Sequence, residues 1–142
     1  MKKMIILLAC LSLTACSEDE NKVEQEPSIY GVWQLTEVYS GPPSGQGWSK
    51  VENGYTIEIS RNLSFDSGFL SDCKTGTVQI NSSEITLKYD CSEITLGVGD
   101  PDGTLSYSYS LGTNLELIPL FVTCFEGCAY RFEKIAEIQI GE

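Results

Sequence analysis

The side chains of this chain that could carry chemistry are cysteines, carboxylates and tyrosines. The sequence holds six cysteines and seven tyrosines but no histidine. Without histidine, neither a Ser-His-Asp nor a Cys-His nucleophile system can be assembled, and no imidazole can hold a metal. No glycine-rich phosphate loop follows a strand-like segment. We therefore do not expect an enzyme, and we expect no catalytic residue, metal or other cofactor.

The first segment, 1–15, has the layout of a secretory signal peptide. Two lysines precede an apolar run over 4–13, which is shorter than the roughly 20 residues that span a bilayer. The run leads into Leu-Thr-Ala-Cys at 13–16, which resembles the lipobox of bacterial lipoproteins. The resemblance implies cleavage before Cys16 and attachment of two or three acyl chains to it. A secretory signal with a cysteine near its end by chance is the alternative.

The next segment, 16–28, is predicted to be the lipidated Cys16 followed by an acidic, disordered tether. The run Ser-Glu-Asp-Glu directly after Cys16 resembles the export signal of surface-exposed lipoproteins in one large group of Gram-negative bacteria. Ser17, in place of an aspartate, fits sorting to the outer membrane. We therefore expect a lipid-anchored outer-membrane protein, exposed at the cell surface if the acidic run is a signal. If the run is only a spacer, the outer membrane is still expected, but the sequence does not decide which leaflet holds the anchor.

The charge of the chain limits its partners. The net charge is −11 at pH 7, and removal of the signal segment takes two lysines with it. A chain this acidic repels nucleic acid and anionic membrane surfaces. The predicted contact with the membrane is therefore through the acyl chains, which hold firmly when there are two or more of them.

Four cysteines remain in the segment expected to fold, and in an exported protein they would form disulfides. They are Cys73, Cys91, Cys124 and Cys128. A hairpin turn near 81–84 would bring Cys73 within one residue of Cys91, and either a bulge at Gly76 or a turn shorter by one residue would align them. Four cysteines allow three pairings, so cross-pairings stay open. A four-thiolate zinc site is a further alternative, although the spacing lacks two close Cys-x-x-Cys pairs.

From Ile29 onward, apolar and polar residues alternate with the period of two that is typical of half-buried strands. Clusters of turn-forming residues separate the runs. We count eight runs, at about 31–40, 54–60, 63–69, 75–80, 84–90, 104–111, 114–118 and 129–136. Because short turns join most neighbours, segment 29–142 is predicted to be one all-β domain, an eight-stranded antiparallel up-and-down barrel.

Two features at the ends of this predicted barrel carry a family resemblance, together with the lipoprotein layout of the chain and the run Cys-Phe-Glu-Gly-Cys-Ala-Tyr-Arg-Phe at 124–132. Gly31-Val32-Trp33 begins the first strand, and Arg131 lies in the last. This order resembles the lipocalin-like family, in particular the small lipocalin-like lipoproteins of Gram-negative bacteria, which are calycin-type barrels. The resemblance implies that Gly31, Trp33 and Arg131 close one end, with the arginine stacked on the indole for about 0.5–2 kcal/mol. The alternative, a core Trp33 with a solvated Arg131, leaves the barrel unchanged.

The candidate ligand-binding residues are aromatic side chains on the predicted inward face or at its rim. They are Tyr39, Tyr55, Phe65, Tyr89, Tyr107 and Tyr109, together with Trp48, which by lipocalin analogy lies on a loop at the open end. Tyrosine combines an apolar ring with a hydrogen-bonding hydroxyl. Glu37 shares parity with Trp33, and an inward carboxylate would need a partner unless it lies beyond the end of the barrel.

An eight-stranded barrel is just wide enough to be filled by side chains or to hold one small ligand. We therefore expect a lipid-anchored envelope protein that binds a small apolar or amphipathic molecule. The alternative is a protein-interaction module with a filled barrel, such as an enzyme inhibitor or an accessory subunit of an outer-membrane complex. A continuous cavity above roughly a few hundred Å³ favours the first interpretation, and a barrel filled by its own aromatic side chains favours the second.

The lipobox assignment predicts the behaviour of the variant Cys16→Ala. Without the lipidated cysteine, the chain should lose its acyl chains and leave the membrane fraction once the signal is removed, because the acidic chain has no other attraction to the bilayer. Membrane fractionation with mass measurement of the mature chain tests this. Membrane retention of a Cys16→Ala chain that has lost residues 1–15 would contradict the assignment.

Overall fold

The computed structural model describes residues 27–41, 47–91, 103–120 and 128–138. This part of the chain contains nine strands and no helix, and accordingly no helix in it is long and apolar enough to cross a bilayer. The strands are β1 (Gly31–Ser40), β2 (Trp48–Lys50), β3 (Thr56–Ile59), β4 (Ser64–Ser67), β5 (Thr75–Ile80), β6 (Glu84–Tyr89), β7 (Thr104–Leu111), β8 (Asn114–Pro119) and β9 (Cys128–Ala136). The signal segment, most of the tether with Cys16, and Cys124 lie outside the described residues.

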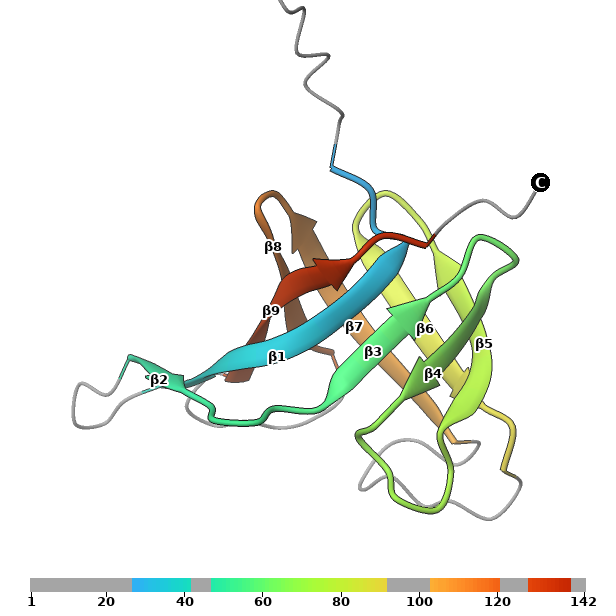
Figure 1. The fold of residues 1–142 in the computed structure, drawn as a ribbon, viewed down its shortest axis with the longest axis horizontal. Coiled ribbons are helices and arrows are strands. Elements are labelled where there is room, and N and C mark those ends of the chain that lie inside the picture. The colour runs from blue at the N-terminus through green and yellow to red at the C-terminus, as the bar shows by residue number, and fades with distance from the viewer. Residues whose placement is uncertain (1–26, 42–46, 92–102, 121–127, 139–142) are drawn as a thin grey trace, which may run out of the picture.

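Eight of the nine strands form a closed antiparallel barrel. From β3 to β9 each strand pairs with its neighbour in the chain, and β1 pairs with both β3 and β9 (Figure 1). Closure leaves no unpaired edge along the barrel wall. The predicted fold class is therefore confirmed, and the architecture is compatible with a lipocalin-like fold. The additional strand β2 was not predicted; its three residues pair with the end of β1, where β1 projects beyond the barrel in Figure 1.

The two ends of the barrel differ in what they connect. The described chain enters at Pro27 and leaves near Ile138 on the same side of the barrel (Figure 1). We call this side, where β1 begins, the closed end. The short turns at 60–63, 81–83 and 112–113 also lie there, because the strands alternate in direction. The opposite side, where β1 ends, is called the open end.

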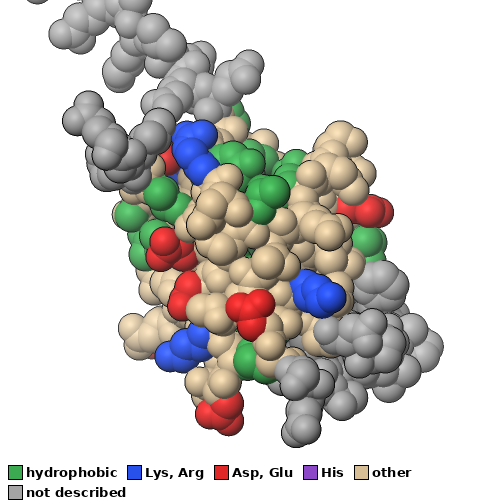
Figure 2. Space-filling view, turned by 90° about the vertical axis from the view of Figure 1, so that its right-hand side faces the viewer, with side chains coloured by type: hydrophobic (Ala, Val, Ile, Leu, Met, Phe, Trp, Pro, Cys, Tyr) green, Lys and Arg blue, Asp and Glu red, His purple; other side chains and the backbone are tan. Residues whose placement is uncertain are grey.

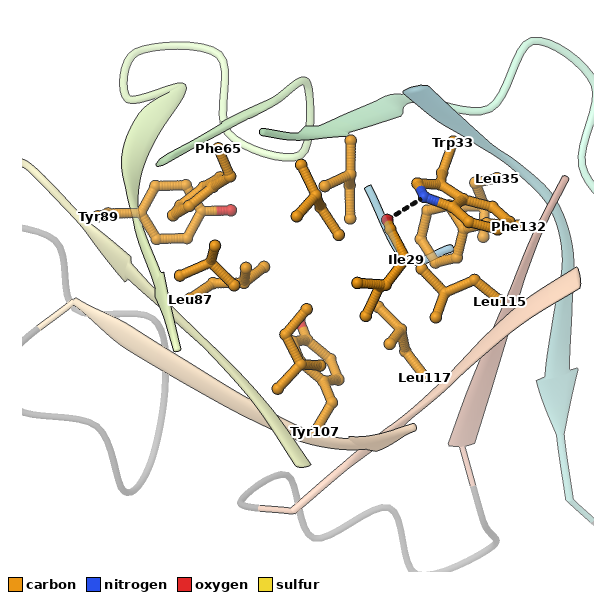
Figure 3. Close-up of a cluster of buried hydrophobic side chains, with 14 of the residues drawn as sticks. Ile29, Trp33, Leu35, Phe65, Leu87, Tyr89, Tyr107, Leu115, Leu117 and Phe132 are labelled. Carbon is orange, nitrogen blue, oxygen red and sulfur yellow. Dashed lines mark hydrogen bonds between the residues drawn. The ribbon is translucent and has the colours of Figure 1, made fainter. Parts of the chain in front are cut away.

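The alternating residues of the strands meet inside the barrel, as the close-up in Figure 3 shows. Trp33 and Phe132 lie on one side of this interior, and Phe65 and Tyr89 lie on the other. Burial of a large apolar side chain contributes about 1.5–3 kcal/mol. The core consists of Ile29, Trp33, Leu35, Ile57, Ile59, Phe65, Cys73, Val78, Ile85, Leu87, Tyr89, Tyr107, Leu115, Leu117 and Phe132.

Gly76 allows β5 to pack closely between its neighbours. A Cβ atom at this position would lie 2.1 Å from the Lys88 carbonyl oxygen and 2.6 Å from the Phe65 ring. The register runs without a shift from the Gly76–Tyr89 pair to the Ile80–Ile85 pair. The bulge considered for Gly76 is therefore absent from this hairpin, and the glycine serves close packing instead.

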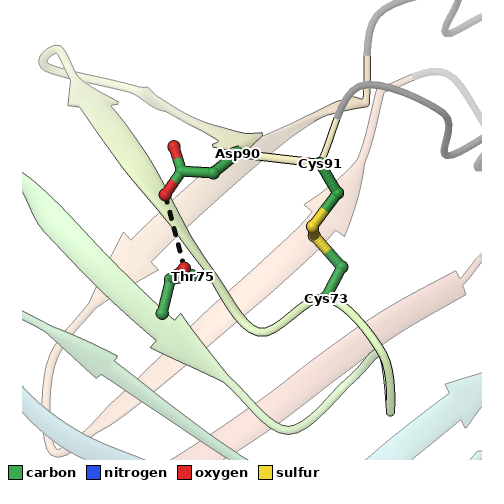
Figure 4. The surroundings of a disulfide bond; sticks show 4 residues. All are labelled: Cys73, Thr75, Asp90 and Cys91. Atoms are coloured by element: carbon green, nitrogen blue, oxygen red, sulfur yellow. Dashed lines mark hydrogen bonds between the residues drawn. A yellow bond between two sulfur atoms is a disulfide. The ribbon is translucent and has the colours of Figure 1, made fainter.

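A disulfide joins Cys73 and Cys91 near the open end (Figure 4). Cys73 precedes β5 and Cys91 follows β6, so irregular backbone on both sides brings their Cα atoms to 6.1 Å without a bulge. This confirms one of the pairings that the sequence left open. A four-thiolate zinc site is ruled out, because two of its thiols are joined to each other. Cys128 is disulfide-bonded as well.

Removal of this cross-link should destabilise the barrel. The bond closes a loop with a sequence separation of 18, and the loop-entropy relation gives about 3 kcal/mol for a loop of that size. We expect the double variant Cys73→Ala/Cys91→Ala to lose about this much free energy of unfolding, measured by urea denaturation under oxidising conditions. Equal unfolding midpoints for the variant and the parent would contradict this.

Candidate ligand-binding site

Trp33 fills the closed end of the barrel. Its side chain is 1% exposed, and its indole Nε1 donates a hydrogen bond of 2.8 Å to the Ile29 carbonyl oxygen (Figure 3). Gly31 has a φ of +150°, and a Cβ atom there would lie 2.6 Å from Cε of Lys134. Glycine at this position therefore lets the end of β9 pass close to the start of β1.

Lys134, rather than Arg131, covers the Trp33 ring. The Lys134 Nζ atom lies 5.2 Å from the ring centroid, and it donates hydrogen bonds to the Ser28 carbonyl oxygen at 2.9 Å and to Glu137 at 2.7 Å. The β1–β9 register places Lys134 opposite Trp33 and Arg131 opposite Glu37. The expected Arg131–Trp33 stack is therefore corrected to a lysine contact.

Arg131 lies on the outer face of the barrel, where a second tryptophan takes the stacking role. Its guanidinium carbon is 3.9 Å from the Trp48 ring centroid, and its nitrogens form ion pairs with Glu116, at 2.8 Å, and with Glu37. These contacts raise the pKa of Arg131, Glu116 contributing most. Ion pairs this exposed add little stability. We therefore infer that the contacts of Arg131 mainly hold β2, through Trp48, against the barrel.

A β-bulge explains why Glu37 faces outward. The β1–β9 register shifts between Leu35 and Glu37, so that Thr36 has no residue opposite it. An extra residue in one strand reverses the side-chain parity beyond it. Leu35 therefore points into the core, while Glu37 points toward Arg131 on the outer face. The predicted inward parity of Glu37 was wrong for this reason.

The same bulge places two of the predicted ligand-binding residues outside the barrel. Tyr39 and Trp48 are register partners in the β1–β2 pair, and their ring centroids are 5.5 Å apart. They lie on the face that carries Glu37 and Arg131. A third candidate, Tyr109, lies near the closed end, where its hydroxyl donates a hydrogen bond of 2.9 Å to the Asn81 carbonyl oxygen.

The other four candidates lie in the barrel interior, and two of them, Tyr55 and Tyr89, lie at its open end. Phe65 packs edge-on against Tyr89, with centroids 4.9 Å apart. Tyr55 directly precedes β3, and Tyr89 is the last residue of β6, so both lie where their strands meet the open end. Tyr107 is the register partner of Pro119, the last residue of β8.

Two further aromatic residues belong to this group and were missed in the sequence. Tyr130 lies 6.5 Å from Tyr107, and Phe132 lies 5.7 Å from Tyr55, both as edge-on ring pairs. The predicted inward face does not include them, because the resemblance directs Arg131, which lies between them, toward Trp33. The alternation of Tyr130 and Phe132 around a charged residue was the signal that could have found them.

The phenol groups of this cluster share a poorly hydrated interior. Burial raises the pKa of Tyr55 above its ordinary value of 10.0, and coulombic interactions with Tyr107, Tyr130 and Tyr89 raise it further. Burial also raises the pKa of Tyr107, with smaller contributions from Tyr89 and Tyr130. The pKa of Tyr89 is raised by burial and lowered in part by the fully buried Ser67 hydroxyl. Tyr55, Tyr89 and Tyr107 are therefore neutral at physiological pH.

Three hydroxyls of the cluster have no hydrogen-bond partner among the described residues. Tyr107 is only 8% exposed, yet no hydrogen bond to its hydroxyl, or to those of Tyr55 and Tyr130, occurs in the described part of the chain. Leaving a buried hydroxyl without a hydrogen bond costs about 1–3 kcal/mol. Such groups are expected to bind water or a ligand. We call Tyr55, Tyr89, Tyr107 and Tyr130 the tyrosine cluster.

Two hollows lie elsewhere on the described surface. A crevice of about 130 Å³ lies beside Trp33 and Lys134 at the closed end, below the 300–1,000 Å³ typical of ligand pockets. A groove of about 380 Å³ is lined by Glu58, Asp66 and Asp90. The described residues contain no group of acidic or cysteine side chains arranged to hold a metal. On the face in Figure 2, single acidic and basic side chains are separated by neutral surface.

Comparisons with known proteins do not assign the chain to a family. No family model matches it, and no curated protein matches it. The fold and the tyrosine cluster therefore define the protein, at the level of class, as a small closed β-barrel with an aromatic interior.

The buried phenols predict how stability depends on alkaline pH. Because the pKa values of Tyr55 and Tyr107 are raised above 10.0 in the folded state, the unfolded chain releases these protons first. Below pH 10 the two groups should not affect stability. Above it, each should lower the free energy of unfolding by about 1 kcal/mol per pH unit.

Urea unfolding between pH 8 and pH 11.5 measures this, with Tyr55→Phe/Tyr107→Phe as the comparison. The double variant should be at least as stable as the parent at pH 8, since neither removed hydroxyl has a partner in the described part of the chain, and it should lose less stability above pH 10. Parallel pH curves for the variant and the parent would contradict the assignment.

Proposed function

We propose that this protein is a lipid-anchored envelope barrel that binds one small apolar or amphipathic molecule at the tyrosine cluster. The observation that carries the proposal is the buried Tyr107 hydroxyl, which has no partner in the described chain and lies beside other unpartnered phenols. The surrounding rings supply an apolar wall, and the hydroxyls supply the few polar contacts that orient a ligand.

The position of the chain ends supports this arrangement. The described chain begins at Pro27, on the side closed by Trp33 and Lys134. A lipid on Cys16 would therefore tether the barrel by its closed end. The tyrosine cluster, which lies toward the open end, would then point away from the bilayer at the outer membrane or the cell surface.

Ligand binding can be tested on the chain from Ser17 to Glu142, which keeps every described residue and lacks only the signal and the lipidated cysteine. The uncharged dye N-phenyl-1-naphthylamine should bind saturably at one molecule per chain, measured by fluorescence titration. The variant Trp48→Phe should bind the dye equally, because Trp48 lies on the outer face.

Native mass spectrometry of the lipoprotein from its own cells supplies a second measurement. We expect a bound small molecule that is released on unfolding. Absence of both this molecule and saturable dye binding would overturn the proposal and favour a protein-interaction module with a filled interior.

A further inference from the structure

The tyrosine cluster contains no positive charge. Three of the described lysines, Lys50, Lys74 and Lys88, are exposed. The exposed Arg61 lies 5.3 Å from the Tyr30 ring centroid. Arg131 lies on the outer face between two glutamates, and Lys134 lies at the closed end against Trp33. All the arginines and lysines of the described chain therefore lie away from the cluster.

The composition of the segments 42–46, 92–102 and 121–127, which lie outside the described residues, shows no cation either. They contain four acidic residues and no lysine, arginine or histidine. An acidic chain with a net charge of −11 adds a general repulsion for anions.

A charged head group is disfavoured at such a site. Transfer of a carboxylate into a poorly hydrated interior is costly unless a cation or several strong donors compensate it. A neutral carbonyl or hydroxyl loses much less hydration, and one or two phenol hydroxyls are enough to satisfy it. The raised pKa values of Tyr55 and Tyr107 have the same cause, because this interior disfavours anions of the protein itself.

We infer that the barrel selects uncharged ligands, in which an apolar body carries a neutral acceptor such as an ester carbonyl or a hydroxyl, and rejects the corresponding carboxylates. This inference rests on the proposed function and specifies its ligand class. The Tyr107 and Tyr55 hydroxyls donate hydrogen bonds to the ligand oxygen, and the rings of Phe65, Phe132 and Tyr89 contact its apolar body. No covalent step is involved.

The test compares three molecules with the same chain length on the Ser17–Glu142 protein at pH 8. Methyl dodecanoate and 1-dodecanol are neutral, while dodecanoate is ionised. Each competes with N-phenyl-1-naphthylamine below its own aggregation concentration. We expect the neutral molecules to displace the dye at concentrations at least about tenfold lower than dodecanoate, since an uncompensated charge costs more than one hydrogen bond.

Two conservative variants locate the selectivity. Tyr107→Phe keeps the buried ring but removes its hydroxyl. It should lower the affinity for methyl dodecanoate about three- to tenfold, the equivalent of one hydrogen bond. It should lower the affinity for N-phenyl-1-naphthylamine less than the affinity for the ester, because the dye carries no carbonyl or hydroxyl oxygen to accept this hydrogen bond. Tyr39→Phe removes a hydroxyl on the outer face and should change neither affinity.

Each outcome separates this inference from the proposed function. Dodecanoate binding as tightly as the neutral molecules, with dye binding intact, would overturn the inference and leave a ligand-binding barrel. Unchanged ester affinity in Tyr107→Phe would likewise overturn the assigned hydrogen bond. Failure of the dye and all three molecules to bind would overturn the proposed function itself.

Discussion

The pairing of β1 with β9 closes the barrel, and one of its two register shifts, the bulge at Thr36, decides which side chains of the later part of β1 face inward. Before the bulge, Trp33 and Leu35 point into the core opposite Lys134 and Phe132. After it, the parity is reversed, because one residue of β1 has no counterpart in β9. The later residues of β1 with the parity of Trp33 therefore face outward. Among them, Glu37 forms an ion pair with Arg131.

This one irregularity separates two chemically different regions. The outer face near β2 collects the charged groups, with Arg131 held between Glu37, Glu116 and the Trp48 ring. The interior keeps the neutral aromatics, since the strand that could have brought an arginine inward presents Tyr130 and Phe132 instead. The absence of a cation near the tyrosine cluster in the described chain thus follows from how the barrel closes.

The eight barrel strands could be predicted because each is coded locally by a period of two, bounded by turn residues. The same alternation placed Tyr55, Phe65, Tyr89 and Tyr107 correctly on the inward face. The short strand β2 could not be predicted, since its three residues have no recognisable period and depend on pairing with β1. Within β9, an arginine was assigned inward by resemblance, and this assignment hid Tyr130 and Phe132.

The position of a tyrosine within a strand does not determine whether its hydroxyl finds a hydrogen-bond partner. Tyr107 and Tyr109 share one face of β7, yet Tyr109 bonds to the Asn81 carbonyl oxygen while Tyr107 has no partner in the described chain. The difference comes from the turn between β5 and β6, which reaches Tyr109 at the closed end and leaves Tyr107 deeper in the barrel.

The amino-acid sequence alone determined the all-β architecture and the exclusion of histidine chemistry, because strand period and composition are local properties. Only the tertiary structure decided which cation covers Trp33, which cysteines pair and which tyrosine hydroxyls lack partners. These outcomes depend on the register between distant segments, such as Glu37 and Arg131, which are 94 positions apart. Packing and closure of the whole barrel set that register. A single unpaired residue at the bulge reverses the side-chain parity of β1 beyond it.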